Sequence, residues 1–174
     1  DNGIIYNSKI LKMIDLRGLN VNLADGSITR LILYGTFLFQ QRDTLHFFVN
    51  HWPSRRSGEE ESEPKRITAA KTLRTEIELL FAKNKNSKII IVGDFNDEPT
   101  NISITENLKA APFFCDSVDH QKLHEDLETD LFNLSYKAWF DGSGSYKYKD
   151  DYNMLDQIII SKELLFAEEI KYVC

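Results

Sequence analysis

A carboxylate and a carboxamide follow a short apolar run in the middle of the chain. Residues 88–92 have the composition of a strand buried on both faces, and a Gly-Asp-Phe-Asn segment follows at residues 93–96. Side chains two apart in an extended segment point to the same side, so Asp94 and Asn96 can converge on one ligand. This pairing suits a hard divalent cation, or a phosphate held by one. The alternative is that both residues only cap a turn.

Two more polar side chains lie at the ends of apolar runs. Residues 45–49 lead into His51, and the run at residues 157–160 is entered through Asp156. If these strands pack side by side, the two side chains gather with Asp94 and Asn96 at one edge of a sheet. Sites in α/β architectures usually lie at such strand ends.

The elements that would position these groups are visible in the periodicity. Leu19, Val21 and Leu23 alternate with polar residues and should face one way. Residues 31–39 and 45–49 are rich in aromatic and branched side chains, and the polar residues between them indicate a turn. The pattern predicts an antiparallel hairpin or meander.

A helix should connect the first two chemical segments. Residues 54–63 are polar and predict a loop with a solvated acidic run. Ser62 is expected just before the helix, with Pro64 in its first turn and the end near Lys85. The members of one apolar stripe repeat at helical spacing and indicate core packing: Ile67, Ala70, Leu73, Ile77, Leu80 and Phe81.

The second half carries weaker signals. Ser103 and Glu106 have the spacing of a capping box and predict a short helix. Residues 116–130 are dense in charged side chains and predict a loop. His120 and His124 lie four apart and could share a helical face, but without an apolar face a solvated loop is favoured over a metal site.

Length and charge bound the class of protein. The 174 residues predict a single domain, residues 1–174, with enough chain for a real core. The net charge of −6 argues against tight nonspecific binding of nucleic acid, but not against a phosphoester enzyme whose positive charge comes from a metal ion. No signal peptide or membrane-spanning run is expected from the sequence, which leaves the compartment open.

Three segments together resemble a known family. Residues 50–55, 93–97 and 155–158 look like three ordered motifs of the endonuclease/exonuclease/phosphatase superfamily, over residues 19–166. The resemblance implies an α/β fold, a four-layer α/β/β/α sandwich of the deoxyribonuclease I type. It also implies that the domain is incomplete at both ends, because the early glutamate motif and the closing Ser-Asp-His motif are not found.

The resemblance also implies roles for the four polar residues. Members cleave phosphoester bonds with a divalent cation, Mg²⁺ or Mn²⁺, near Asp94 and Asn96. Asp94 would position or deprotonate the attacking water, and Asn96 would bind the phosphate or the water. His51 would contact the scissile phosphate and the leaving oxygen. Asp156 would orient a second histidine, and no histidine follows it in the chain.

The substrate is the open question at this stage. The resemblance implies a phosphoester, either nucleic acid or a small molecule. Trp52 and Arg55 could stack on a base or pair with a phosphate, or they could pack in the core and pair with the acidic run. A noncatalytic relic that uses the scaffold to bind a partner is the alternative function. A plain α/β binding domain is a third reading, and it requires four coincidences at His51, Asp94, Asn96 and Asp156.

Overall fold

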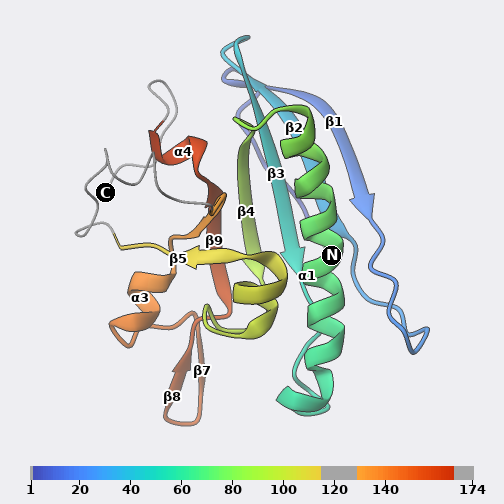
Figure 1. Cartoon of the computed structure of the whole chain (residues 1–174), viewed down its shortest axis with the longest axis vertical. Coiled ribbons are helices and arrows are strands. Elements are labelled where there is room, and N and C mark those ends of the chain that lie inside the picture. Colours follow the sequence, from blue (N-terminus) through green and yellow to red (C-terminus); the bar gives the residue numbers. More distant parts are fainter. Residues whose placement is uncertain (1, 115–128, 167–174) are drawn as a thin grey trace.

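One mixed β-sheet forms the centre of the protein. The computed structural model describes residues 2–114 and 129–166. Seven strands pair in the order β1-β2-β3-β4-β9-β6-β5, and only the pairs β3–β4 and β5–β6 are parallel (Figure 1). The strands are β1 (Leu11–Leu19), β2 (Ile32–Phe39), β3 (Asp43–His51), β4 (Lys88–Asp94), β5 (Ala110–Pro112), β6 (Leu131–Asn133) and β9 (Asp156–Ser161).

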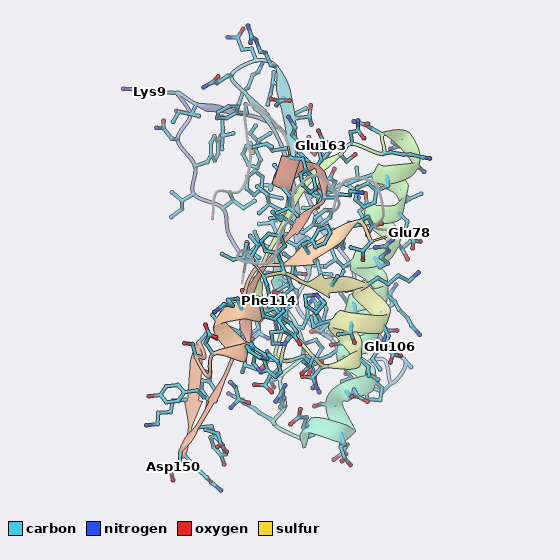
Figure 2. The ribbon with its side chains drawn as sticks, turned by 60° about the vertical axis from the view of Figure 1, so that its left-hand side comes forward. Lys9, Glu78, Glu106, Phe114, Asp150 and Glu163 are labelled. Atoms are coloured by element: carbon cyan, nitrogen blue, oxygen red, sulfur yellow. The ribbon has the colours of Figure 1, made fainter. Side chains whose placement is uncertain are left out.

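Helices and a small hairpin accompany this sheet. They are α1 (Glu59–Lys83), the π-helix η1 (Ser103–Leu108), α3 (Tyr136–Phe140), α4 (Glu163–Phe166) and the hairpin of β7 (Tyr146–Tyr148) and β8 (Asp151–Asn153). Figure 2 shows this hairpin projecting from the body of the protein, with Asp150 at its tip. Among the described helices, none has the length and apolar character needed to cross a membrane.

The antiparallel hairpin predicted within residues 31–49 is confirmed. β2 and β3 pair along their length, as their aromatic and branched side chains favour. β3 begins at Asp43 rather than at Leu45. The turn is shorter than predicted because Gln40 and Gln41 adopt left-handed backbone angles, with φ of 45° and 61°.

The connection between β3 and β4 differs from the prediction at its start. We expected a loop up to Ser62, but α1 begins at Glu59 with Gly58 at its N-cap. The acidic residues 59–61 occupy the first turn, where carboxylates interact favourably with the positive end of the helix dipole. Ser62 is buried inside the helix and donates its hydroxyl to the Gly58 carbonyl oxygen. Pro64 therefore lies beyond the first turn.

The apolar stripe of α1 packs against the sheet, as the periodicity predicts. Leu73 and Ile77 are fully buried and belong to the same cluster as Phe48, Ile89 and Ile91 of the central strands. Because side chains alternate along a strand, these strand residues define one face of the sheet. That face carries the main core of the protein.

The opposite face of the sheet is less covered. Ile90 and Val92 lie on it half-buried, and Leu16 and Ile158 are 46% and 48% exposed there. The α/β class predicted from the resemblance is confirmed. Of the four expected layers, the described residues include one sheet with α1 on one face (Figure 1). On the other face, Leu164 and Leu165 of α4 form a second core cluster with Ile160.

The capping box predicted at Ser103 and Glu106 is not formed. Residues 103–108 form a π-helix without a side-chain cap at its N-terminus. The Ser103 hydroxyl is buried and donates instead to Asp97 Oδ2 at 2.6 Å. A buried carboxylate outcompetes the local backbone for this hydroxyl because charge-assisted hydrogen bonds are the stronger ones.

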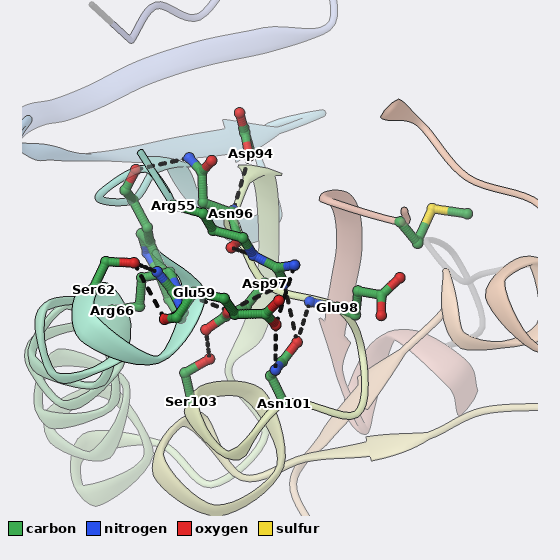
Figure 3. Close-up of polar contacts among 12 residues, drawn as sticks. Arg55, Glu59, Ser62, Arg66, Asp94, Asn96, Asp97, Glu98, Asn101 and Ser103 are labelled. Carbon is green, nitrogen blue, oxygen red and sulfur yellow. Dashed lines mark hydrogen bonds and ion pairs between the residues drawn. The ribbon is translucent and has the colours of Figure 1, made fainter. Parts of the chain in front are cut away.

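That carboxylate belongs to a buried polar cluster that joins several elements (Figure 3). Arg66 of α1 lies with Nε 2.7 Å from Asp97 Oδ1, and neither side chain is exposed. Arg55 lies 3.3 Å from the same oxygen. Gln157 of β9 donates from Nε2 to the Asp97 carbonyl oxygen at 2.6 Å. We call these residues and Ser103 the Asp97 cluster; it fixes the segment after β4 against α1, η1 and β9.

Removing the cation of this cluster should destabilise the protein strongly. In Arg66→Met, the Asp97 carboxylate stays buried without its main partner, and we expect the free energy of unfolding to fall by about 3 kcal/mol or more. Urea denaturation of the full-length protein measures this. Arg17→Met is the matched control, because it removes an exposed ion pair with Glu76 and should cost less than about 1 kcal/mol. Equal losses in the two variants would contradict the role of the cluster.

Candidate active site

Three neighbouring strands bring three of the candidate side chains into one row. His51 at the end of β3 is directly paired with Asp94 at the end of β4. Asp94 is in turn paired with Asp156 at the start of β9. Paired residues of neighbouring strands point to the same face. The alternation along β4 places this row on the face opposite α1, together with Ile90 and Val92.

The row is close enough for direct interaction. His51 Nε2 lies 3.6 Å from Asp94 Oδ2. Both side chains are about one-third exposed, at 34% and 32%, so the pair is reachable from solvent. An imidazole beside a carboxylate at a strand end can exchange a proton with a bound ligand.

Asn96 is held at the same edge by a tight turn. Its backbone N–H donates to Asp94 Oδ1 at 2.8 Å, and its side-chain Nδ2 donates to the Trp52 carbonyl oxygen at 2.9 Å. Asn96 has φ of 50°, a left-handed conformation that Asn tolerates well. The turn alternative raised by the sequence is therefore realised. The turn uses only Asp94 Oδ1, and Asp94 Oδ2 still faces His51. Asp94 can therefore stabilise the turn and take part in a site.

Burial and a neighbouring carboxylate make the environment of the Asp94 carboxylate unfavourable for its charge. Burial raises the pKa of Asp94 above its ordinary value, and the charge of Asp156 raises it further. The backbone N–H of Asn96 and the charges of His51 and Arg30 lower the pKa but do not cancel the rise. Two carboxylates opposite each other on adjacent strands repel, and a cation between them would relieve this repulsion.

The donors at this edge suit a cation only in part. Asp94 and Asn96 provide the oxygen ligands that Mg²⁺ prefers. Within residues 2–114 and 129–166, however, no group of three or more His, Cys, Asp or Glu side chains could hold a metal ion. His120 and His124 lie outside the described residues. Water and the substrate would have to supply the other ligands.

A cleft of about 600 Å³ opens beside Asp94 and Asn96. Its other lining residues were not singled out from the sequence, apart from Arg55: Ser54, Arg55, Arg56, Glu59, Tyr146, Tyr148, Asn153 and Leu155. The tyrosines come from the β7–β8 hairpin, far from Asp94 in sequence. The alternation of Tyr146, Lys147 and Tyr148 indicates a strand, but nothing local shows that this strand borders the cleft.

Trp52 does not fit a role in substrate binding. The structure places it in the core at 1% exposure, with Nε1 donating to Asn50 Oδ1 at 3.0 Å. Its ring meets Phe95 edge to face, with centroids 4.8 Å apart. A buried indole offers no surface to a base, because the hydrogen bond and the aromatic contact already occupy it.

Arg55 lines the cleft, but its guanidinium is already bonded to neighbouring protein groups. Its Nε donates to the Asn96 carbonyl oxygen at 2.5 Å, and Nη1 lies 3.2 Å from Glu59 Oε1. Together with the contact to Asp97, these bonds fix the turn that carries Asn96 (Figure 3). The predicted pairing with the acidic run is thus observed at Glu59, and Arg55 acts mainly as a positioning residue.

Gly93 is the position at which this edge tolerates no side chain. A Cβ there would lie 2.0 Å from the Asn50 carbonyl oxygen, and φ is 132°. Gly93→Ala should lower the free energy of unfolding by about 3 kcal/mol or more, from backbone strain and overpacking together. Gly142→Ala is the matched control, since its φ of 82° is also positive but nothing lies within 4 Å. It should cost only about 1–2 kcal/mol. Thermal and urea unfolding separate the two, and similar losses would show that the close approach is unimportant.

Solved structures with a similar fold are found at low sequence identity. The human Nocturnin catalytic domain, solved with a bound sulfate anion, matches with a TM-score of 0.57 and 20% identity, over 88% of this chain and 49% of that one. Truncated TDP2 from Caenorhabditis elegans matches with a TM-score of 0.56 and 11% identity, over 88% of this chain and 54% of that one. A mannosyl-6-phosphatase from Bacteroides thetaiotaomicron matches with a TM-score of 0.57 and 15% identity, over 90% of this chain and 55% of that one. These similarities show the fold, and the chain spans about half the length of each structure. No curated protein matches the chain.

The sequence itself shows the family. The profile described as Endonuclease/Exonuclease/phosphatase family matches the chain over residues 1–174. The resemblance inferred from the motifs at residues 50–55, 93–97 and 155–158 is thereby confirmed. The chain belongs to the endonuclease/exonuclease/phosphatase family.

Proposed function

We propose that the protein hydrolyses phosphoesters by activating water at a divalent-cation site. The observation that carries the proposal is the row of His51, Asp94 and Asp156 on three adjacent strands, with Asn96 beside it. Family membership supports the same chemistry, and one structural neighbour is named a phosphatase. The substrate is a phosphoester, either nucleic acid or a small molecule.

Each side chain in the row has a role that its position permits. Asp94 accepts a proton from the attacking water. His51, next to it, contacts the phosphate and protonates the leaving oxygen. Asn96 keeps its amide nitrogen bonded to the Trp52 carbonyl and can direct its oxygen toward the ligand. Asp156 adds negative charge beside Asp94 and can orient a water molecule. Phosphoryl transfer needs such an oriented nucleophile and such proton management.

Mg²⁺, or Mn²⁺, is the cation that the donors suit. Asp94 and Asn96 would hold it through oxygen atoms, and Asp156 would contribute charge nearby. The ion supplies charge neutralisation for the phosphate when bound. Zinc is disfavoured, because its sites use clusters of His and Cys.

Substitution of Asp94 should separate activity from stability. In Asp94→Asn, the acceptor for the Asn96 N–H is kept but the base is lost, so kcat for a generic phosphodiester should fall roughly 10²-fold or more. His51→Ala should cause a comparable loss. Because the folded state raises the pKa of Asp94, the ionised carboxylate lowers the stability of the folded state relative to the unfolded chain. Without divalent cations, Asp94→Asn should therefore unfold at the same temperature as the native protein or higher.

The matched control for these assays is Asp15→Ala, on the edge strand β1. Asp15 is exposed and, among the described residues, its ion pair is with Arg17 at 3.7 Å, so the change should alter neither kcat nor the melting temperature appreciably. Near-native activity of Asp94→Asn would contradict the assigned role. A full-length protein with no turnover at all would favour the noncatalytic alternative.

Metal preference gives a second test. Calorimetric titration of the full-length protein with MgCl₂ or MnCl₂ should show binding that Asp94→Ala weakens roughly tenfold or more, since a carboxylate ligand is lost. Chelation should abolish activity, and added Mg²⁺ or Mn²⁺ should restore it. Tight binding of Zn²⁺ with no response to Mg²⁺ would overturn the assignment.

A further inference from the structure

A second groove runs from the candidate cleft across the surface. It has a volume of about 750 Å³ and shares Ser54 and Arg56 with the cleft beside Asp94. It is also lined by Arg30 and Lys65. We call it the arginine groove. Because the two hollows share lining residues, a ligand in the cleft can extend into the groove along a continuous surface.

The charge of this groove is opposite to that of the protein. The whole chain has a net charge of −6, yet the groove is lined by the cations Arg30, Arg56 and Lys65 and by no carboxylate. Its other polar lining side chains are hydroxyls: Ser27, Thr29, Ser54, Ser57 and Ser62. The hydroxyls of Ser27 and Ser62 already donate to Asp25 and to the Gly58 carbonyl oxygen. The cations, with the hydroxyls of Thr29, Ser54 and Ser57, favour an anion.

Two of the cations are available for a ligand. Lys65 is paired with Asp25 at 2.8 Å. In the part of the chain that the structure describes, Arg30 and Arg56 have neither a hydrogen bond nor an ion pair, and both are exposed. Four other arginines are each paired with a carboxylate: Arg17, Arg55, Arg66 and Arg74. In a chain with 27 acidic side chains, an unpaired arginine is not the common case, and here two line one groove.

We propose that the arginine groove binds a second phosphate group of the substrate, carried by the same molecule as the phosphoester in the cleft. This inference rests on the proposed function, because the cleft must hold the first phosphate. Arginine suits the task, since its planar guanidinium donates two parallel hydrogen bonds to phosphate oxygens. A nucleotide chain and a small bisphosphate share this chemistry.

The groove would act on substrate choice rather than on the chemical step. Arg30 and Arg56 would contact the second phosphate rather than the reacting one, so this contact strengthens binding of the ground state and the transition state equally. Such uniform binding lowers KM and leaves kcat unchanged. Molecules with one phosphate would use the cleft alone and bind more weakly.

Binding of matched probes to the full-length protein tests the proposal without requiring turnover. The first pair is TpT and pTpT, which differ by one terminal phosphate on a nucleotide chain. The second pair is fructose 6-phosphate and fructose 1,6-bisphosphate. Calorimetry in Mg²⁺ should show that the second phosphate tightens Kd roughly tenfold or more in at least one pair, and that pair identifies the source. Arg30→Ala and Arg56→Ala should each remove most of this advantage, measured as the ratio of the two Kd values within the pair.

Arg42→Ala is the matched control, because it makes the same charge change at the opposite end of β3 and should leave every Kd unchanged. Arg30→Ala and Arg56→Ala should melt at the temperature of the native protein. Equal affinities within both pairs would overturn the proposal, as would an advantage that survives in Arg30→Ala and Arg56→Ala together. Turnover of bis(p-nitrophenyl) phosphate, which has one phosphate, reports separately on the proposed function.

Discussion

The buried ion pair between Arg66 and Asp97 is the interaction on which the rest of the site depends. Both side chains are fully buried, so each needs the other to avoid an uncompensated charge in the core. Asp97 follows Asn96 directly, so the pair fixes the turn that carries the candidate ligands. Because Ser103 and Gln157 bond to the same residue, η1 and β9 are held in the same place. The buried Asp97 cluster therefore fixes the position of the candidate site residues at the surface.

Strand pairing then decides which side chains meet. The ladder that pairs His51 with Asp94 and Asp94 with Asp156 is made by backbone hydrogen bonds, and it leaves little freedom in the row. Placing two carboxylates opposite each other costs stability in the protein alone. A fold stable enough to hold them there can use that unfavourable charge to bind a cation, which is a common conflict between stability and function.

The distribution of charge around the row of His51, Asp94 and Asp156 also affects how an anion approaches the site. An acidic protein repels anions over most of its surface, so a region without carboxylates stands out as a place of approach for a phosphate. Tyr146, Tyr148 and Arg56 line the cleft beside Asp94, and the arginine groove shares Ser54 and Arg56 with it. Binding energy for the substrate can therefore come from groups remote from the reacting phosphate.

The sequence by itself determined the local elements and named the candidate site residues. The apolar run before Asp94, the run that ends at His51 and the helical stripe of α1 are periodic over a few residues, and the structure contains all three. The motifs also sufficed to recognise the family. These features depend on neighbours in sequence, which is why they can be read without coordinates.

Only the tertiary structure decided which polar side chains face the cleft and which support it. Ser103 bonds Asp97 rather than capping its helix, and Trp52 is buried rather than exposed. Arg55 is held by Glu59, whereas Arg56, its neighbour, remains available for a ligand. Each of these outcomes depends on burial and on partners brought close by packing. A local sequence pattern contains no information on such distances, so residues of the same type and neighbourhood had different roles.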